Sequence, residues 1–226
     1  MTDFIVDTLS RTQFEQMIAG AHVLEDDGFS GKVLLSRQGK ILKLFKAKRR
    51  CSSNLWDPYA LRFARHAAML RSRGITAPFV ESVFNILESN YQIVVYTRLE
   101  GQTLRQKLQG EPILRRRREL LKCLARFVAD LHARGILFSS LHFGNILVCP
   151  SKNWALIDVT DVKIYDRALN VWRRLRNFRH LSRYAEDRAW IDECPRSEFL
   201  KIYTASAPWN GLSRWIFSQR MLSDVL

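Results

Sequence analysis

A chain of 226 residues, 47% of them hydrophobic, is long enough to bury a substantial core, either as one domain or as two small lobes. Its formal net charge of +14 is uneven: residues 1–100 carry 14 Lys and Arg against 10 Asp and Glu, a balance of +4, whereas residues 101–226 carry 22 against 12, a balance of +10. The excess predicts an anionic partner for the second half, such as nucleic acid, an acidic membrane surface or a phosphorylated substrate, with solubility alone as the alternative reason.

The first half is typical of an antiparallel sheet with one helix. Runs rich in Val, Ile, Leu and Phe predict strands at residues 22–27, 32–37, 40–46, 79–87 and 91–99. Turn residues at 38–39 and 89–90 join two pairs of these runs. Between the third and fourth runs, Asp57 as N-cap and Pro58 at the first helical position predict a helix to about Arg73, before a glycine.

The second half is typical of a mainly helical unit. A cap at 101–103 predicts a short helix, and residues 112–133 predict a long one that Gly135 ends. The apolar face of the long helix comprises Leu120, Leu121, Leu124, Phe127, Val128 and Leu131. A helical region from about 167 to 184 and two shorter helices rich in aromatic residues follow.

A hairpin with an apolar stem is predicted at residues 141–159, LHFGNILVCPSKNWALIDV. Asn145 and Asp158 lie on either side of its turn, thirteen positions apart. An amide oxygen and a carboxylate are ligands of a hard divalent cation such as Mg²⁺, which keeps room for substrate phosphates. We therefore expect Asn145 and Asp158 to bind a metal ion.

This hairpin resembles the catalytic loop and metal-binding strand of the protein-kinase-like superfamily, and most closely the small-molecule and sugar kinases with an HGDLHPGNIL type of loop. The matching residues are Leu141, His142, Gly144, Asn145, Ile146 and Leu147. The resemblance implies ATP and Mg²⁺ as cofactors, with Asn145 and Asp158 on the metal ion. Ser140 stands where that superfamily carries its catalytic Asp.

The catalytic Asp of the superfamily is replaced by Ser140 in this chain, which removes the usual base. A positioned base typically contributes ~10²- to 10⁴-fold, whereas phosphoryl transfer depends mainly on metal electrostatics and alignment, so a slow kinase is physically allowed. The catalytic candidates are Ser140, orienting an acceptor hydroxyl, and His142, serving as a substitute base. Asp161 is a second carboxylate after Asp158 that either binds metal or caps the next turn.

The order of three strands, a helix and two strands resembles a kinase N-terminal lobe. Lys43 matches the strand lysine that contacts the α and β phosphates, and His66 stands in place of the glutamate that usually pairs with it, with half-buried packing as its alternative role. Gly28 and Gly31 are candidates for a glycine-rich turn over phosphates, with an ordinary hairpin turn as the alternative. The fold class implied is α+β and bilobal, with an N-lobe at 1–98 and a C-lobe at 99–226.

Near the C-terminus, the segment RxRNFRHLxRY resembles the bacterial lipopolysaccharide core kinase family, which phosphorylates heptose or Kdo sugars at the inner face of the cytoplasmic membrane. The longer stretch around it, residues 167–190, has an apolar stripe that comprises Leu169, Trp172, Leu175, Phe178 and Leu181. The arginines around the stripe, which suit phosphate, are Arg173, Arg174, Arg176, Arg179 and Arg183. The resemblance covers roughly residues 28–187 and implies a lipopolysaccharide core or other phosphorylated glycolipid as acceptor.

We expect the protein to be cytoplasmic and to lie peripherally at the anionic inner face of the cytoplasmic membrane. The first residues lack a basic segment followed by an apolar run, so a secretory signal is not expected. Four scattered cysteines without a CxxC pair argue against a zinc site and a disulfide framework.

Two functions stay open: an ATP-dependent kinase of a lipopolysaccharide core sugar, and a pseudokinase that binds a partner or lipid without transferring phosphate. Nucleic acid is not an expected partner, because no recognised motif accompanies the basic charge.

Overall fold

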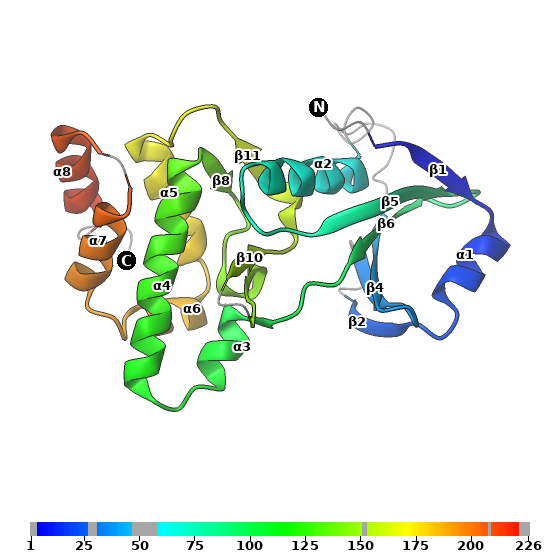
Figure 1. The fold of residues 1–226 in the computed structure, drawn as a ribbon, viewed down its shortest axis with the longest axis horizontal. Helices are drawn as coiled ribbons and strands as arrows, with labels where there is room; N and C mark the ends of the chain where they lie inside the picture. The colour runs from blue at the N-terminus through cyan, green and yellow to red at the C-terminus, as the bar shows by residue number, and fades with distance from the viewer. Residues whose placement is uncertain (1–3, 27–30, 47–57, 151–152, 208, 222–226) are drawn as a thin grey trace. The chain divides into compact units, whose positions relative to one another are not determined.

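The computed structural model describes residues 4–26, 31–46, 58–150, 153–207 and 209–221. The chain divides into two units, residues 1–99 and residues 100–226 (Figure 1). Each unit has its own set of strands and helices.

The first unit is built on a six-stranded sheet. Its elements are β1 (Val6–Leu9), α1 (Arg11–Ile18), β2 (His22–Asp26), β3 (Gly31–Leu35), β4 (Lys40–Lys46), α2 (Tyr59–Ser72), β5 (Phe79–Ile86) and β6 (Tyr91–Thr97). The strand order is β1-β5-β6-β4-β3-β2, and every neighbouring pair is antiparallel except β1 with β5. All five strands expected in this half are present.

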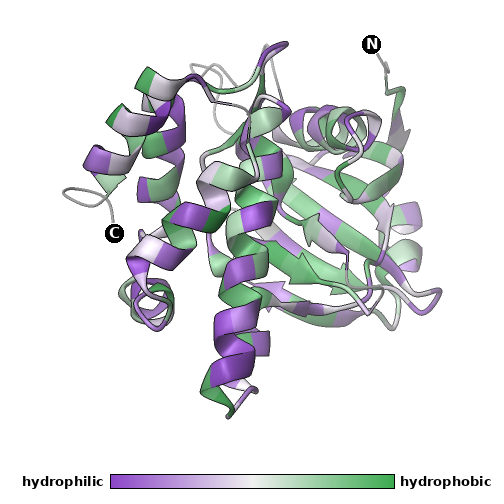
Figure 2. Cartoon of the chain, turned by 60° about the vertical axis from the view of Figure 1, so that its left-hand side comes forward, coloured by the Kyte–Doolittle hydropathy of each residue, from purple (hydrophilic) through white to green (hydrophobic). Residues whose placement is uncertain are grey.

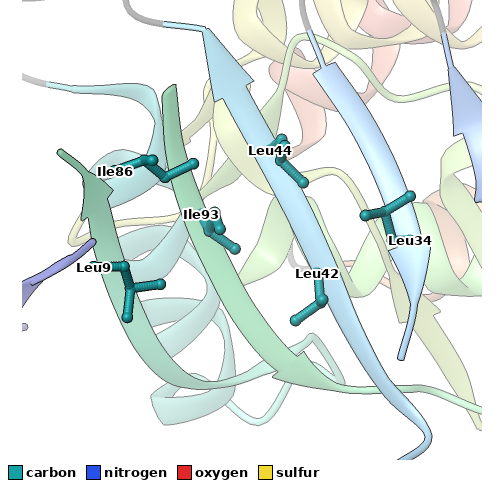
Figure 3. Close-up of a cluster of buried hydrophobic side chains, with 6 residues drawn as sticks. All are labelled: Leu9, Leu34, Leu42, Leu44, Ile86 and Ile93. Atoms are coloured by element: carbon teal, nitrogen blue, oxygen red, sulfur yellow. The ribbon is translucent and has the colours of Figure 1, made fainter. Parts of the chain in front are cut away.

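The two helices of this unit cover opposite faces of the sheet. Because side chains alternate along a strand, Leu42 and Leu44 of β4 point to one face and Phe45 to the other. Leu42 and Leu44 belong to a buried cluster (Figure 3). Side chains of α1 pack against this cluster. The cluster comprises Leu9, Leu34, Leu42, Leu44, Ile86 and Ile93. On the other face, the ring of Phe45 lies 5.8 Å from that of Phe63 in α2.

The strand β1 and the helix α1 were not expected from the sequence. A capping box begins α1: the side chain of Ser10 accepts from the backbone of Gln13, and the side chain of Gln13 accepts from the backbone of Ser10. The spacing Ser-x-x-Gln was therefore a readable signal. The parallel pairing of β1 with β5, in contrast, joins Val6 to Val83 and has no local signature.

The start of α2 differs from the expectation. Pro58 is its N-cap, with extended backbone angles, and not its first helical residue. The fixed φ of proline suits either position, so sequence alone does not separate them. The expected cap, Asp57, lies outside the described residues. Gly74 ends the helix as expected, with φ of 73°.

The second unit is mainly helical. Its elements are β7 (Gln102–Thr103), α3 (Leu104–Gln109), α4 (Leu114–Ala133), β8 (Ile136–Phe138), η2 (Phe143–Asn145), β9 (Ile146–Val148), β10 (Trp154–Leu156), η3 (Val159–Asp161), β11 (Val162–Ile164), α5 (Val171–Leu181), α6 (Ala185–Ile191), α7 (Arg196–Ala205) and α8 (Gly211–Arg220). The short strands form a three-stranded sheet, β10-β9-β7, and a pair, β11-β8.

The long helix α4 matches its prediction closely. Leu121, Leu124, Val128 and Leu131 are buried on the expected apolar face. Purple, the colour of hydrophilic residues, is concentrated at its N-terminal end in Figure 2, where Arg115 to Arg118 lie. Four of the basic residues of this unit therefore lie together near the N-terminal end of α4.

The region after the hairpin differs in detail from the prediction. Helix α5 begins only after its N-cap Asn170, and in the described residues three helices, not two, follow it. Trp172, assigned to the apolar stripe, is 64% exposed, whereas Arg174, assigned to its polar surroundings, is 2% exposed. A guanidinium that is buried in this way cannot belong to an exposed phosphate-binding surface.

The expected fold class, α+β with an antiparallel sheet and helix in one unit and mainly helices in the other, is confirmed. Among the described residues, no helix is both long enough and apolar enough to span a membrane.

Candidate functional site

The hairpin that the sequence predicted is formed by β9 and β10. Ile146 pairs with Leu156, and the backbone N–H of Ile157 donates to the carbonyl of Asn145 at 3.0 Å. Asn145 and Asp158 therefore lie at the open end of the same ladder. The structure thus brings the two expected metal ligands to one end of a rigid element.

Asn145 is oriented by the loop that precedes it. Its side chain is 8% exposed, and its amide nitrogen Nδ2 donates to the main-chain carbonyl of Ser140 at 2.9 Å. With the nitrogen used in this way, the oxygen Oδ1 is the remaining polar atom of the amide. An oxygen is the ligand that Mg²⁺ accepts.

Asp158 adopts a backbone conformation that few residues with a side chain adopt. Its φ of 52° and ψ of 48° are left-handed, and its side chain is exposed. Asp tolerates this region better than most residues, although such positions cost of order 1 kcal/mol and cluster at functional sites. The strained position supports a functional role for the Asp158 carboxylate.

Ser140 and Asp161 are in direct contact. The Ser140 hydroxyl Oγ donates to the Asp161 carboxylate oxygen Oδ2 at 3.3 Å. The backbone holds both residues in place, since the N–H of Ser139 donates to the carbonyl of Asp161 at 3.0 Å and Phe138 pairs with Val162. The carboxylate missing from position 140 is thus present beside it, on a different segment.

His142 is half-buried and bound to its own loop. Its Nδ1 accepts from the backbone N–H of Gly144 at 3.1 Å, and its ring meets that of Tyr184 edge to face, with centroids 5.0 Å apart. Burial, and then the positive charge of Arg105, lower the pKa of His142, while Asp187 and Asp158 act in the opposite direction. The ring is therefore neutral at pH 7, and because Nδ1 is the acceptor, its proton is on Nε2.

The same loop is held by a buried carboxylate, that of Asp187, which was not identified as a site residue from the sequence. Asp187 of α6 is fully buried and accepts from the backbone N–H of Phe143 at 3.0 Å. Arg105 of α3 donates to both of its oxygens, each at 3.0 Å. A bidentate pair of this kind is strong and directional, so it fixes the loop against two helices.

A second buried network supports the strand before the loop. The Oδ1 of Asn177 accepts from the N–H of Phe138 and lies 3.0 Å from Nε2 of His132, while Nδ2 of Asn177 donates to the carbonyl of Phe138. The Nδ1 of His132 lies 2.7 Å from the hydroxyl of Tyr203, and Arg174 donates to the oxygen of that hydroxyl. Asn177 and Arg174, both from the Arg-rich segment, are therefore part of the buried hydrogen-bond network that supports the strand before the loop.

The remaining site candidates belong to the first unit. Lys43 lies on β4, and its Nζ is 5.5 Å from the ring centroid of Phe45 and 5.7 Å from that of Phe63. His66 is half-buried on α2. Gly31 begins β3 opposite Phe45, and Gly28 lies outside the described residues. The glycine-turn prediction, like the phosphate-binding role of Lys43, stays a prediction.

The donor set at the hairpin fits Mg²⁺ better than a transition metal. Within the described part of the chain, no group of three or more His, Cys, Asp or Glu residues could hold a metal ion. Mg²⁺ does not need such a cage, since it binds through one or two protein oxygens and keeps waters and substrate phosphates as its other ligands. Asn145 and Asp158 supply two oxygen donors of this kind.

Comparisons with known proteins agree at the level of the fold. No protein-family model and no curated protein sequence matches the chain. A co-crystal structure of WbdD with the kinase inhibitor LY294002 is similar, with a TM-score of 0.52 and 14% identity, covering 89% of this chain and 45% of that one. A crystal structure of WbdD at 2.2 Å resolution has a TM-score of 0.45 and 14% identity, covering 89% of this chain and 50% of that one. The chain spans about half the length of these structures.

Proposed function

We propose that this chain is a kinase-like phosphotransferase that moves the γ-phosphoryl group of ATP to a hydroxyl of a lipopolysaccharide core sugar. The observation that carries the proposal is the hairpin geometry: Asn145 and Asp158 lie at the same end of the β9–β10 ladder, with the Asn145 amide oriented by the Ser140 carbonyl. Rigid placement of two oxygen donors is what alignment of a nucleotide phosphate requires.

ATP and Mg²⁺ are the proposed cofactors. Asn145 and Asp158 would hold the metal ion, which when bound neutralises charge on the phosphates. By the family resemblance, Lys43 of β4 is a proposed phosphate-contacting residue. The residues around Ser140 and His142 would receive the acceptor, with Nε2 of His142 as a hydrogen-bond donor.

The proposed acceptor rests on the family resemblance and on charge. Residues 101–226 have a balance of +10, and Arg176, Arg179 and Arg183 are exposed on α5 and just beyond it. Guanidinium groups suit phosphate, and a basic surface is attracted to anionic lipid. These features support a phosphorylated glycolipid acceptor and work at an anionic membrane surface.

A specific observation favours a second function, that of a pseudokinase. Position 140 carries a hydroxyl where a carboxylate would serve as base, and that hydroxyl donates to Asp161. A chain of this kind would keep the fold while acting through a partner or a lipid.

Phosphate incorporation separates the two functions. Lipopolysaccharide core is incubated with Mg-ATP and either the wild type or Asp158→Ala, and the phosphate added to the core is measured by mass spectrometry. The kinase predicts incorporation that is lost in Asp158→Ala and retained in Asp130→Asn, a surface control. No incorporation by the wild type, where a known core kinase modifies the same acceptor, would favour the pseudokinase.

A further inference from the structure

The contact between Ser140 and Asp161 joins two parts of the site. Asp161 ends η3 and directly precedes β11, which pairs with β8, the strand before the Ser140 loop. Its backbone carbonyl accepts from Ser139, and its side chain accepts from Ser140. Two hydrogen bonds from neighbouring residues thus fix both the main chain and the carboxylate of Asp161. The side chain is also exposed, so a substrate can reach it.

We infer that Asp161 is the catalytic base of the phosphoryl transfer and that Ser140 positions its carboxylate. This inference rests on the proposed function. In the reaction, the oxygen of the acceptor hydroxyl forms a bond to the γ-phosphorus of ATP. The bond from that phosphorus to the β–γ bridging oxygen breaks, and ADP leaves with the electron pair. The hydroxyl proton passes to the carboxylate of Asp161.

The other two polar side chains of the loop are less suited to accept that proton. The Ser140 hydroxyl is neutral and already donates to Asp161. His142 uses Nδ1 to accept from Gly144, so its neutral ring offers a donor at Nε2. A carboxylate oxygen, in contrast, is an acceptor that can take the proton directly. Asp161 thus supplies, 21 positions later in the chain, the group that Ser140 lacks.

A carboxylate swap tests this assignment. Because Ser140 Oγ and Asp161 Oδ2 are 3.3 Å apart, a carboxylate at position 140 occupies nearly the same region of the site. Four proteins are compared: wild type, Asp161→Asn, the double variant Ser140→Asp with Asp161→Asn, and Asp130→Asn as a charge-matched control. Asp130 lies on α4 in an exposed pair with Arg134, and pairs of this kind contribute little to stability. The rate of phosphate incorporation into lipopolysaccharide core, the dissociation constant of Mg-ATP and the thermal midpoint are measured for each.

The expected rate of Asp161→Asn is about 10²- to 10⁴-fold below wild type, the usual contribution of a positioned base, with an unchanged dissociation constant for Mg-ATP. The double variant recovers at least about tenfold of that loss, because the base has only moved. The control behaves as wild type. If Asp161→Asn lowers the thermal midpoint, its reduced rate no longer tests the role of Asp161. The recovery of the rate in the double variant then decides whether Asp161 is the base.

Four results would overturn the assignment. A wild-type rate in Asp161→Asn, or no recovery in the double variant, removes Asp161 as base while leaving the proposed function intact. Weaker Mg-ATP binding in Asp161→Asn, in proportion to its rate, makes Asp161 a metal or nucleotide ligand instead. A wild type that transfers no phosphate removes the proposed function and the base together, and Mg-ATP binding then shows whether the nucleotide site remains.

Discussion

The side-chain amide of Asn145 donates to the main-chain carbonyl of Ser140 at 2.9 Å, so the residue expected to bind metal also holds the loop that carries Ser140. Replacing a buried donor leaves the carbonyl unsatisfied, which costs about 1–3 kcal/mol. A change at Asn145 should therefore act on both stability and nucleotide binding.

We expect Asn145→Asp and Asn145→Ala to differ in kind. Both lose the bond to the Ser140 carbonyl, and both should lower the free energy of unfolding by about 1–3 kcal/mol in urea titrations. Asn145→Asp keeps an oxygen ligand, so it should retain Mg²⁺-dependent binding of ATP that Asn145→Ala loses. Equal ATP binding by Asn145→Ala and wild type, measured by calorimetry with and without Mg²⁺, would remove Asn145 from the metal site.

Because the backbone of Asp158 is left-handed, two substitutions at this position can distinguish the effect of backbone strain on stability from the role of the carboxylate in binding. Asp158→Ala should lose Mg²⁺-dependent ATP binding and also about 1 kcal/mol of stability, because Ala tolerates a φ of 52° poorly. Asp158→Gly should lose the same binding and keep stability, since Gly adopts this conformation freely. Urea titration beside calorimetry checks both, and Asp158→Gly with intact binding would contradict the metal role.

The pair of Arg105 and Asp187 predicts a large loss of stability. Arg105→Ala leaves the fully buried Asp187 carboxylate without its cation, which costs about 3–5 kcal/mol. Arg11→Ala, which breaks the exposed pair with Glu15, should change stability by less than about 0.5 kcal/mol. The free energies of unfolding in urea compare the two variants directly, and similar values would show that the buried pair does not hold the loop.

His132 predicts a dependence of stability on pH. Burial lowers the pKa of His132 to about 3 in the folded chain, below the 6.5 that is usual for histidine. The unfolded chain therefore takes up a proton that the folded chain refuses, so this contribution to stability is complete above pH 6.5 and is lost as the pH falls towards 3. The slope approaches about 1.4 kcal/mol per pH unit for this one proton.

The variant His132→Gln isolates this proton. Urea titrations at several values between pH 7 and pH 5 should give a shallower decline for the variant than for wild type, although the variant starts from lower stability. His142 and His180, whose pKa values burial also lowers, remain in both proteins and so cancel. Parallel declines would show that His132 is protonated within the fold.

Two glycines with nearly equal φ make a matched pair. Gly135 (φ 75°) and Gly39 (φ 76°) both resist an alanine through backbone strain of about 1–2 kcal/mol. A Cβ on Gly39 would have no atom within 4 Å, whereas on Gly135 it would overlap the carbonyl oxygens of Tyr165 and Arg167. Gly135→Ala should therefore cost about 1–3 kcal/mol more than Gly39→Ala in urea titrations, and equal costs would show that the backbone there yields.

The sequence by itself determined the elements whose information is local. The Asn145 and Asp158 hairpin follows from two short apolar runs around a turn, and the strand at residues 40–46 has the predicted bounds. The long helix α4 follows from its apolar periodicity. In each case the residues that decide the structure lie within about twenty positions of one another, so period and turn chemistry suffice.

The tertiary structure decided which distant residues meet. Ser140 meets Asp161 only because β8 pairs with β11, and Arg105 meets Asp187 across 82 positions. Arg174 reads in the sequence as one more surface arginine, yet it is buried against Tyr203. A side chain's identity sets what it can bond to, whereas long-range packing sets its partner and its burial, and no local pattern contains that information. The candidate metal ligands could therefore be found from sequence, and the candidate base could be assigned only from the fold.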